Sequence, residues 1–102
     1  SPAMARLLIE AGCDVNNADN HGETVMHVAV MSAASDPEGI GQSVKFLRLI
    51  LEQKPDLSAR DSRGYLAFQS KRRRNVPQAF ERILARLKDH EVAKPWIDKE
   101  DG

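Results

Sequence analysis

Four consecutive cations, Lys71-Arg72-Arg73-Arg74, are the residues whose type and spacing most clearly point to chemistry in this chain. Adjacent like charges repel one another and isolated surface charges contribute little to folding, so the run is either a solvated face or a site for an anion. The functional alternatives are a docking patch for an acidic peptide, a nuclear-import signal and a contact to phosphate. Aromatic residues are not interleaved with the cations, so stacking of single-stranded bases is not indicated.

Patterns for catalysis or metal binding are missing from the sequence. It contains no nucleophile motif, no glycine-rich phosphate loop and no pair of carboxylates placed in a helix-lined cleft. The histidines, His21, His27 and His90, have no second His or Cys at the spacing of metal ligands. The single cysteine, Cys13, cannot form an internal disulfide, which favours a reducing compartment. The sequence therefore predicts no enzyme activity, no metal and no cofactor.

Charge is distributed unevenly although the net charge is zero. Residues 60–88 hold nine Lys/Arg and two Asp/Glu, whereas the rest of the chain holds six and thirteen. Such a basic block affects association more than folding. No apolar run approaches the roughly 18–20 residues that span a bilayer, and no signal segment leads the chain. We expect an intracellular protein, nuclear or cytoplasmic, that does not enter a membrane.

Helices must position these residues, because apolar residues recur at helical spacing and strand-like alternation is absent. The predicted helices cover residues 4–11, 24–33, 44–53, 67–73 and 78–90. The apolar residues expected to face inward are Met26, Ala29 and Val30 in the second, Phe46, Leu47, Ile50 and Leu51 in the third, and Phe80, Ile83, Leu84 and Leu87 in the last. Gly12 is expected to end the first helix, Ser43 to cap the third and Pro55 to stop it. Residues 35–41 carry two glycines and a proline and predict a loop. Beyond Val92 the sequence turns polar and is expected to be mostly disordered.

One segment recurs after 42 residues. Gly22 opens an apolar helical segment in which Thr24 is the expected N-cap, and Gly64 opens a weaker copy. Lys54 stands where the earlier unit has Gly12. Each helix pair has an apolar stripe too small to be buried alone, so neighbouring units must stack on one another.

The segment Gly22-Glu23-Thr24-Val25-Met26-His27 resembles the Thr-Pro-Leu-His opening of the ankyrin repeat, with Val25 in place of proline and Met26 in place of leucine. Residues 7–16 are similar to the second helix and exit of a preceding unit, and residues 49–61 resemble the same exit. The resemblance implies an all-α, ankyrin-like helix-turn-helix solenoid of about two and a half repeats with a degenerate C-terminal capping repeat.

On this resemblance the chain divides into five segments: residues 1–3, compatible with a cloning remnant; 4–21, the second half of a repeat; 22–63, a repeat with an insertion near 35–42; 64–90, the capping repeat; and 91–102, a charged tail. The insertion is either a further contact or a tolerated loop. Two and a half units are fewer than the three or more that such stacks usually need. The first helix is therefore expected to leave apolar surface exposed, and missing upstream repeats or a homo-oligomer would cover that surface. In the tail, Pro95-Trp96-Ile97 either folds back onto the last helix or docks another protein.

The resemblance also implies roles for single residues. His27 is expected to hydrogen-bond locally and to brace one unit against the next. Cys13 is expected to be a small buried thiol rather than a reactive one. His21, at a turn tip, and His90, near a helix end, are expected to be solvated.

Partners of the family are held by the turn tips and by the exposed inner face of each unit's first helix. By position these residues are Asn20, His21, Glu23, Met31, Ser32, Ser62, Arg63, Tyr65, Arg73 and Arg74. The later ones are basic with one aromatic, which suits an acidic, partly extended segment. Replacing Arg73 and Arg74 together with Glu is predicted to weaken partner binding and to leave thermal stability nearly unchanged.

The expected function is therefore that of a scaffold or adaptor module that recognises another protein. Two alternatives remain open. One is a nucleic-acid-associated regulatory module that uses the basic block, which the missing aromatics make the less favoured interpretation. The other is a structural dimerisation or end-cap unit that binds nothing beyond itself.

Overall fold

The computed structural model describes residues 14–71 and 73–97, and this part of the chain is mostly helical. Its helices are α2 (Val25–Ala34), the short 3-10 helix η1 (Pro37–Gly39), α3 (Ile40–Glu52), α4 (Phe80–Leu87) and α5 (Lys94–Ile97). Among these residues β pairing is limited to one isolated antiparallel bridge, Arg60 to Leu66. The predicted all-α class is confirmed at this level. The helix predicted over residues 4–11, its Gly12 cap and Cys13 lie outside the described residues.

Helix α2 begins where the sequence predicts. The Thr24 hydroxyl accepts the backbone N–H of His27, and the His27 ring accepts the backbone N–H of Thr24, which completes a capping box. Met26 and Val30 point into the core and are at most 1% exposed. The cap fixes the start of the helix and therefore the face that it buries.

Helix α3 begins earlier than predicted, and Ser43 lies inside it instead of capping it. The Asp36 carboxylate accepts the backbone N–H of Gly39, and a proline at the first position of η1 already has the φ of a helical turn. The turn therefore continues directly into α3 at Ile40. The loop predicted here shrinks to residues 35–36.

The end of α3 agrees with the sequence. The helix ends at Glu52, and Lys54 adopts a left-handed φ of +52° at the position where the earlier unit has Gly12. Pro55 comes next and cannot donate a further helical hydrogen bond. The chain then leaves α3 towards residues 56–66.

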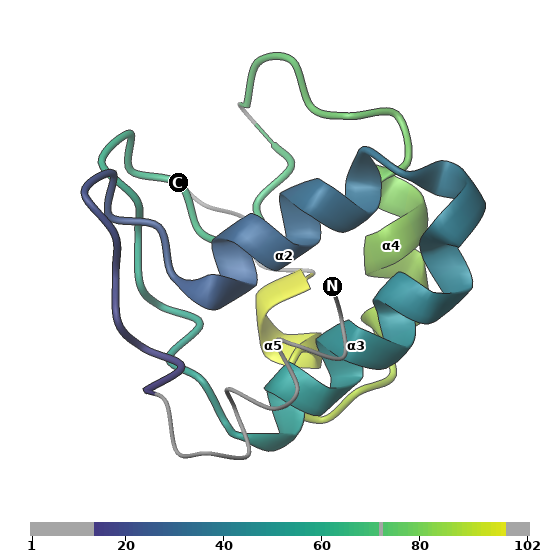
Figure 1. Cartoon of the computed structure of the whole chain (residues 1–102), viewed down its shortest axis with the longest axis horizontal. Coiled ribbons are helices and arrows are strands. Elements are labelled where there is room, and N and C mark those ends of the chain that lie inside the picture. The colour runs from purple at the N-terminus through teal and green to yellow at the C-terminus, as the bar shows by residue number, and fades with distance from the viewer. Residues whose placement is uncertain (1–13, 72, 98–102) are drawn as a thin grey trace.

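The core lies where α2, α3 and α4 pack against one another (Figure 1). Its largest fully buried side chains are Met26, Val30, Leu47, Ile50, Leu51, Phe68, Phe80, Ile83 and Leu87. The inward faces predicted for the third and last helices are confirmed, with Phe46 only half-buried. Helix α4 is shorter than the predicted 78–90. Each fully buried aliphatic or aromatic side chain contributes about 1.5–3 kcal/mol, so this junction holds the fold.

The helix predicted over residues 67–73 is wrong for the described part of that range. The Gln69 side-chain oxygen accepts the N–H of Leu66 at 3.1 Å, and its amide nitrogen donates to the carbonyl of Lys71 at 3.1 Å. These local bonds compete with helical ones and hold a turn that buries Phe68. The adjacent cations further disfavour a helix, since like charges one turn apart repel.

The tail beyond Val92 is ordered as far as Ile97, so the prediction of a mostly disordered tail is wrong there. Ala93 is fully buried, and Trp96 and Ile97 pack against the core. Of the two alternatives for Pro95-Trp96-Ile97, folding back onto the helices is the one observed. The remaining residues of the tail lie outside the described part.

Candidate functional site

Two turns lie side by side at one edge of the helices, at the left of Figure 1. We call residues 19–23 the first turn and residues 61–65 the second turn. The backbone N–H of Ser62 donates to the carbonyl oxygen of His21 at 2.8 Å and joins the two turns directly. The edge is therefore a stack of two turns and not a pair of independent loops.

The first turn is built around Asp19. Its carboxylate oxygen Oδ1 accepts the backbone N–H of His21 at 2.8 Å and that of Glu23 at 2.9 Å. The backbone N–H of Asp19 donates to the Glu23 carbonyl at 2.9 Å, and that of Gly22 donates to the Asp19 carbonyl at 3.0 Å. Gly22 has a φ of +72°, which residues with a Cβ rarely adopt.

The second turn repeats this construction around Asp61. Its Oδ1 accepts the backbone N–H groups of Arg63 and Tyr65, both at 2.9 Å. The N–H of Asp61 donates to the Tyr65 carbonyl at 3.0 Å, and that of Gly64 donates to the Asp61 carbonyl at 2.9 Å. Gly64 has a φ of +87°. Each hydrogen bond of the first turn has its counterpart 42 residues later.

The repetition begins before the turns. The N–H of Asn16 donates to the Asp14 carboxylate at 2.8 Å, and the N–H of Ser58 donates to the Asp56 carboxylate at 3.0 Å. The N–H of Asp56 donates to the side-chain oxygen of Asn16 at 2.7 Å, which is a second link between the units. The recurrence seen in the sequence is thus a recurrence of hydrogen bonds.

His27 connects the start of α2 to the second turn. Its Nδ1 accepts the N–H of Thr24 at 3.2 Å, and its Nε2 lies 2.9 Å from the carbonyl oxygen of Tyr65. A carbonyl can only accept, so Nε2 carries the proton and Nδ1 is the acceptor. The ring is buried, and it bonds both locally and to the next unit, as the resemblance implies. Gln69 holds the equivalent place in the second unit, where its Oε1 replaces Nδ1.

Two carboxylates of this edge are stabilised in their charged form. The backbone N–H of Glu23, and after it the N–H of His21, lower the pKa of Asp19 below its ordinary value of 3.8. The hydroxyl and then the backbone N–H of Ser58 lower the pKa of Asp56 in the same direction. Both carboxylates therefore act as acceptors that close turns.

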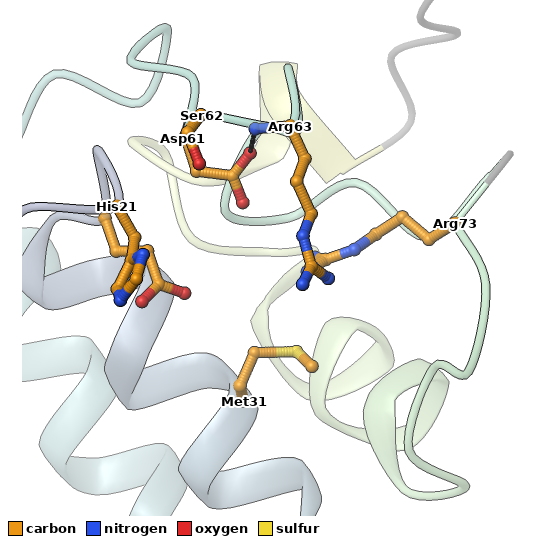
Figure 2. Close-up of a pocket in the computed structure, with 7 residues that line it drawn as sticks. His21, Met31, Asp61, Ser62, Arg63 and Arg73 are labelled. Carbon is orange, nitrogen blue, oxygen red and sulfur yellow. Dashed lines mark hydrogen bonds between the residues drawn. The ribbon is translucent and has the colours of Figure 1, made fainter.

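A pocket of about 310 Å³ lies between the two turns and α2. It is lined by His21, Glu23, Met31, Asp61, Ser62, Arg63 and Arg73 (Figure 2). Six of these are among the ten residues that the resemblance assigns to partner contact. Asp61 was missed, although its position 42 residues after Asp19 was a signal present in the sequence. The structure thus brings together residues from α2, from both turns and from the basic run.

Arg73 is held in place by its neighbours. Its guanidinium carbon lies 4.8 Å from the centre of the Tyr65 ring and 5.7 Å from that of Phe80, and its Nη1 donates to the Gln69 carbonyl at 3.2 Å. Cation–π contacts of this kind contribute about 0.5–1 kcal/mol each at partly exposed sites. The prediction of unchanged stability after substitution of Arg73 and Arg74 therefore needs revision for Arg73. The Arg63 side chain, by contrast, has no hydrogen bond or ion pair with any described residue.

The other expected contact residues are spread more widely. Asn20, Ser32, Tyr65 and Arg74 do not line this pocket. Lys71 lines a different pocket, of about 350 Å³, together with Lys88 of the segment after α4. Arg72 lies outside the described residues. Lys71 and Arg73 therefore line different pockets, and Arg74 is exposed.

Comparison of the chain with protein-family models, with curated proteins and with solved structures found no significant match. Within the described residues, no three His, Cys, Asp or Glu side chains are grouped so that they could hold a metal ion. None of the helices found there has both the length and the apolar character needed to cross a bilayer. The stacked turns and the pocket between them are therefore the features that bear on function.

Proposed function

We propose that this chain is a protein-binding module of the ankyrin-like type, a scaffold or adaptor unit that holds part of another protein between its stacked turns. The observation that carries the proposal is the pocket between the two turns. Six residues that the resemblance assigns to partner contact line this one pocket, although they come from four separate places in the chain.

The repeated hydrogen bonds support the ankyrin-like interpretation. The Asp-centred turn, its glycine and the interlocking backbone recur together, which is expected when similar units stack along one direction. The N–H of Asn20 is the counterpart of the Ser62 N–H and has no partner among the described residues. A further turn from an upstream repeat, or from a second copy of the chain, would find a donor there. We therefore include such neighbours among the proposed partners.

The charges of the pocket support a protein segment with acidic side chains as the ligand. Arg63 is available for an ion pair, and Arg73 is already oriented by Tyr65 and Gln69. A guanidinium that is fixed beforehand loses less conformational entropy when it binds a carboxylate. Charge-assisted, bidentate bonds to such groups are among the stronger hydrogen bonds.

The proposal is tested with two probes, a fluorescent oligoglutamate peptide and a random-sequence DNA duplex. Affinities are measured at several salt concentrations for the natural chain, for Arg63→Glu and for the control Lys45→Glu, which changes an exposed residue of α3. We expect Arg63→Glu to weaken peptide binding about tenfold, which corresponds to about 1.4 kcal/mol, and Lys45→Glu to change it little.

Three outcomes would contradict the proposal. Tighter binding of DNA, with a steep salt dependence, would favour the nucleic-acid alternative. Equal effects of the two substitutions would mean that the probe senses net charge and not the pocket. Binding of neither probe would favour a purely structural unit.

A further inference from the structure

The pocket between the turns carries both signs of charge in equal number. Glu23 and Asp61 supply two carboxylates, and Arg63 and Arg73 supply two guanidinium groups. One acidic group in a ligand can pair with the guanidinium groups, but a second acidic group, or the second charge of a phosphate, would meet the carboxylates and weaken the binding. The charge balance favours a ligand that is itself dipolar.

The two carboxylates differ in the number of hydrogen bonds that they already make within the protein. Oδ1 of Asp61 accepts two backbone N–H groups that close the second turn. The Glu23 side chain makes no hydrogen bond or ion pair with any described residue. Glu23 is therefore the carboxylate left to bind a ligand, as Arg63 is the guanidinium left to do so.

The two guanidinium groups enter the pocket from the side opposite the first turn. In Figure 2 the side chain of His21 lies on one side, those of Arg63 and Arg73 extend in from the other, and Met31 lies beneath the space between them. Glu23 belongs to the same turn as His21. The first turn thus contributes the Glu23 carboxylate, the second turn and the basic run contribute both guanidinium groups together with Asp61, and Met31 supplies the apolar base.

We propose that this pocket recognises an extended peptide segment in which an acidic and a basic residue stand two positions apart. The acidic side chain pairs with Arg63 and Arg73, and the basic one pairs with Glu23. In an extended chain residues i and i+2 point to the same side, about 6–7 Å apart. The side chain between them points away from the pocket, so the peptide backbone lies over Met31. This inference rests on the proposed function and adds the charge pattern of the partner.

The probes are three capped pentapeptides with the central residues Glu-Ala-Lys, Glu-Ala-Glu and phosphoserine-Ala-Glu, each flanked by glycines. The readout is the NMR signal of the Met31 methyl group in protein labelled at its methionine methyls. Met26 is 1% exposed and serves as an internal reference. We expect the Glu-Ala-Lys peptide to shift the Met31 signal with an affinity about fivefold or more above that of the other two peptides.

A matched pair of variants identifies the residue responsible. Glu23→Gln should abolish the preference for Glu-Ala-Lys over Glu-Ala-Glu, whereas Glu52→Gln, at the exposed end of α3, should preserve it. Tighter binding of either all-acidic peptide to the natural chain would overturn the dipolar inference and leave the proposed acidic partner standing. A Met31 signal that responds to none of the peptides, with oligoglutamate binding also insensitive to Arg63→Glu, would overturn both.

Discussion

The first and second turns share their hydrogen bonds but lead into different structures. After the first turn, Thr24 caps a ten-residue helix, whereas after the second turn Leu66 has no hydroxyl and no helix forms before the basic run. The local bond at the cap is nevertheless kept, since Gln69 takes the place of His27. The turn is thus specified by its Asp and Gly, and the helix needs a separate cap and an apolar stripe.

The two turns also differ in how their glycines are surrounded. A Cβ on Gly22 would lie 3.0 Å from the backbone nitrogen of Ser62, whereas a Cβ on Gly64 would meet nothing within 4 Å. The first turn is covered by the second, and the second is open on that side among the described residues. The two turns have the same local structure but different packing, so the same substitution should destabilise the first turn more than the second.

The largest expected effect comes from Gly22→Ala compared with Gly64→Ala. Both place an alanine at positive φ, which costs about 1–2 kcal/mol. Gly22→Ala must also push the second turn away and weaken the Ser62 hydrogen bond, so its total cost is about 3 kcal/mol. Chemical denaturation of both variants measures the difference. Equal losses of unfolding free energy would mean that the two turns are not in close contact at Gly22.

Next in size is the replacement of His27. His27→Ala leaves the Thr24 N–H and the Tyr65 carbonyl without their partner and should cost about 2 kcal/mol of unfolding free energy. His27→Gln should recover part of this loss, because Gln69 makes the same local bond in the second unit. Thermal melts of both variants test it. No advantage of Gln over Ala would refute the equivalence of the two positions.

A smaller effect is expected when Arg73→Ala is compared with Arg74→Ala. Arg73 contacts Tyr65 and Phe80 and bonds to Gln69, so its loss should destabilise the fold by about 1 kcal/mol. Arg74 is exposed and should have almost no effect on stability. Melting temperatures that fall equally, or not at all, would show that the Arg73 contacts contribute nothing.

The smallest expected effect is the acid sensitivity of Asp19. Its folded-state pKa is lower than its ordinary value of 3.8, so its contribution to stability is present above that value and is lost as the pH falls through the folded pKa. Asp19→Asn keeps an acceptor oxygen but cannot titrate. Between about pH 4.5 and pH 2.5 the natural chain should lose more melting temperature than Asp19→Asn does. Parallel curves would contradict the assignment.

The sequence predicted those features that short-range patterns determine. Residue spacing predicted the inward faces of α2, α3 and α4. Local backbone chemistry predicted Thr24 as a cap and the equivalence of Lys54 with a glycine. The ten residues assigned to partner contact came from the resemblance, and six of them line one pocket. Whether they bind a partner stays a prediction.

Other features depend on the contacts of individual side chains, some local and some between distant residues, and could not be predicted from the sequence. The side chain of Gln69 closes a turn where the sequence predicted a helix, and Ala93 is fully buried in a segment with a polar composition. Arg73 resembles a solvated cation in the sequence, yet the rings of Tyr65 and Phe80 position it. The sequence does contain the 42-residue spacing from Asp19 to Asp61, but that Asp61 lines a pocket follows only from the packing of the two turns.

The most direct test of the stacked turns is a measurement of the scalar coupling across the hydrogen bond from the Ser62 N–H to the His21 carbonyl. It is made by NMR on protein labelled with ¹⁵N and ¹³C. We predict a measurable coupling and slow exchange of the Ser62 amide with solvent, since this bond joins the turns at 2.8 Å. A missing coupling together with an amide that exchanges as fast as in an open loop would contradict it, because the pocket would then have no fixed walls.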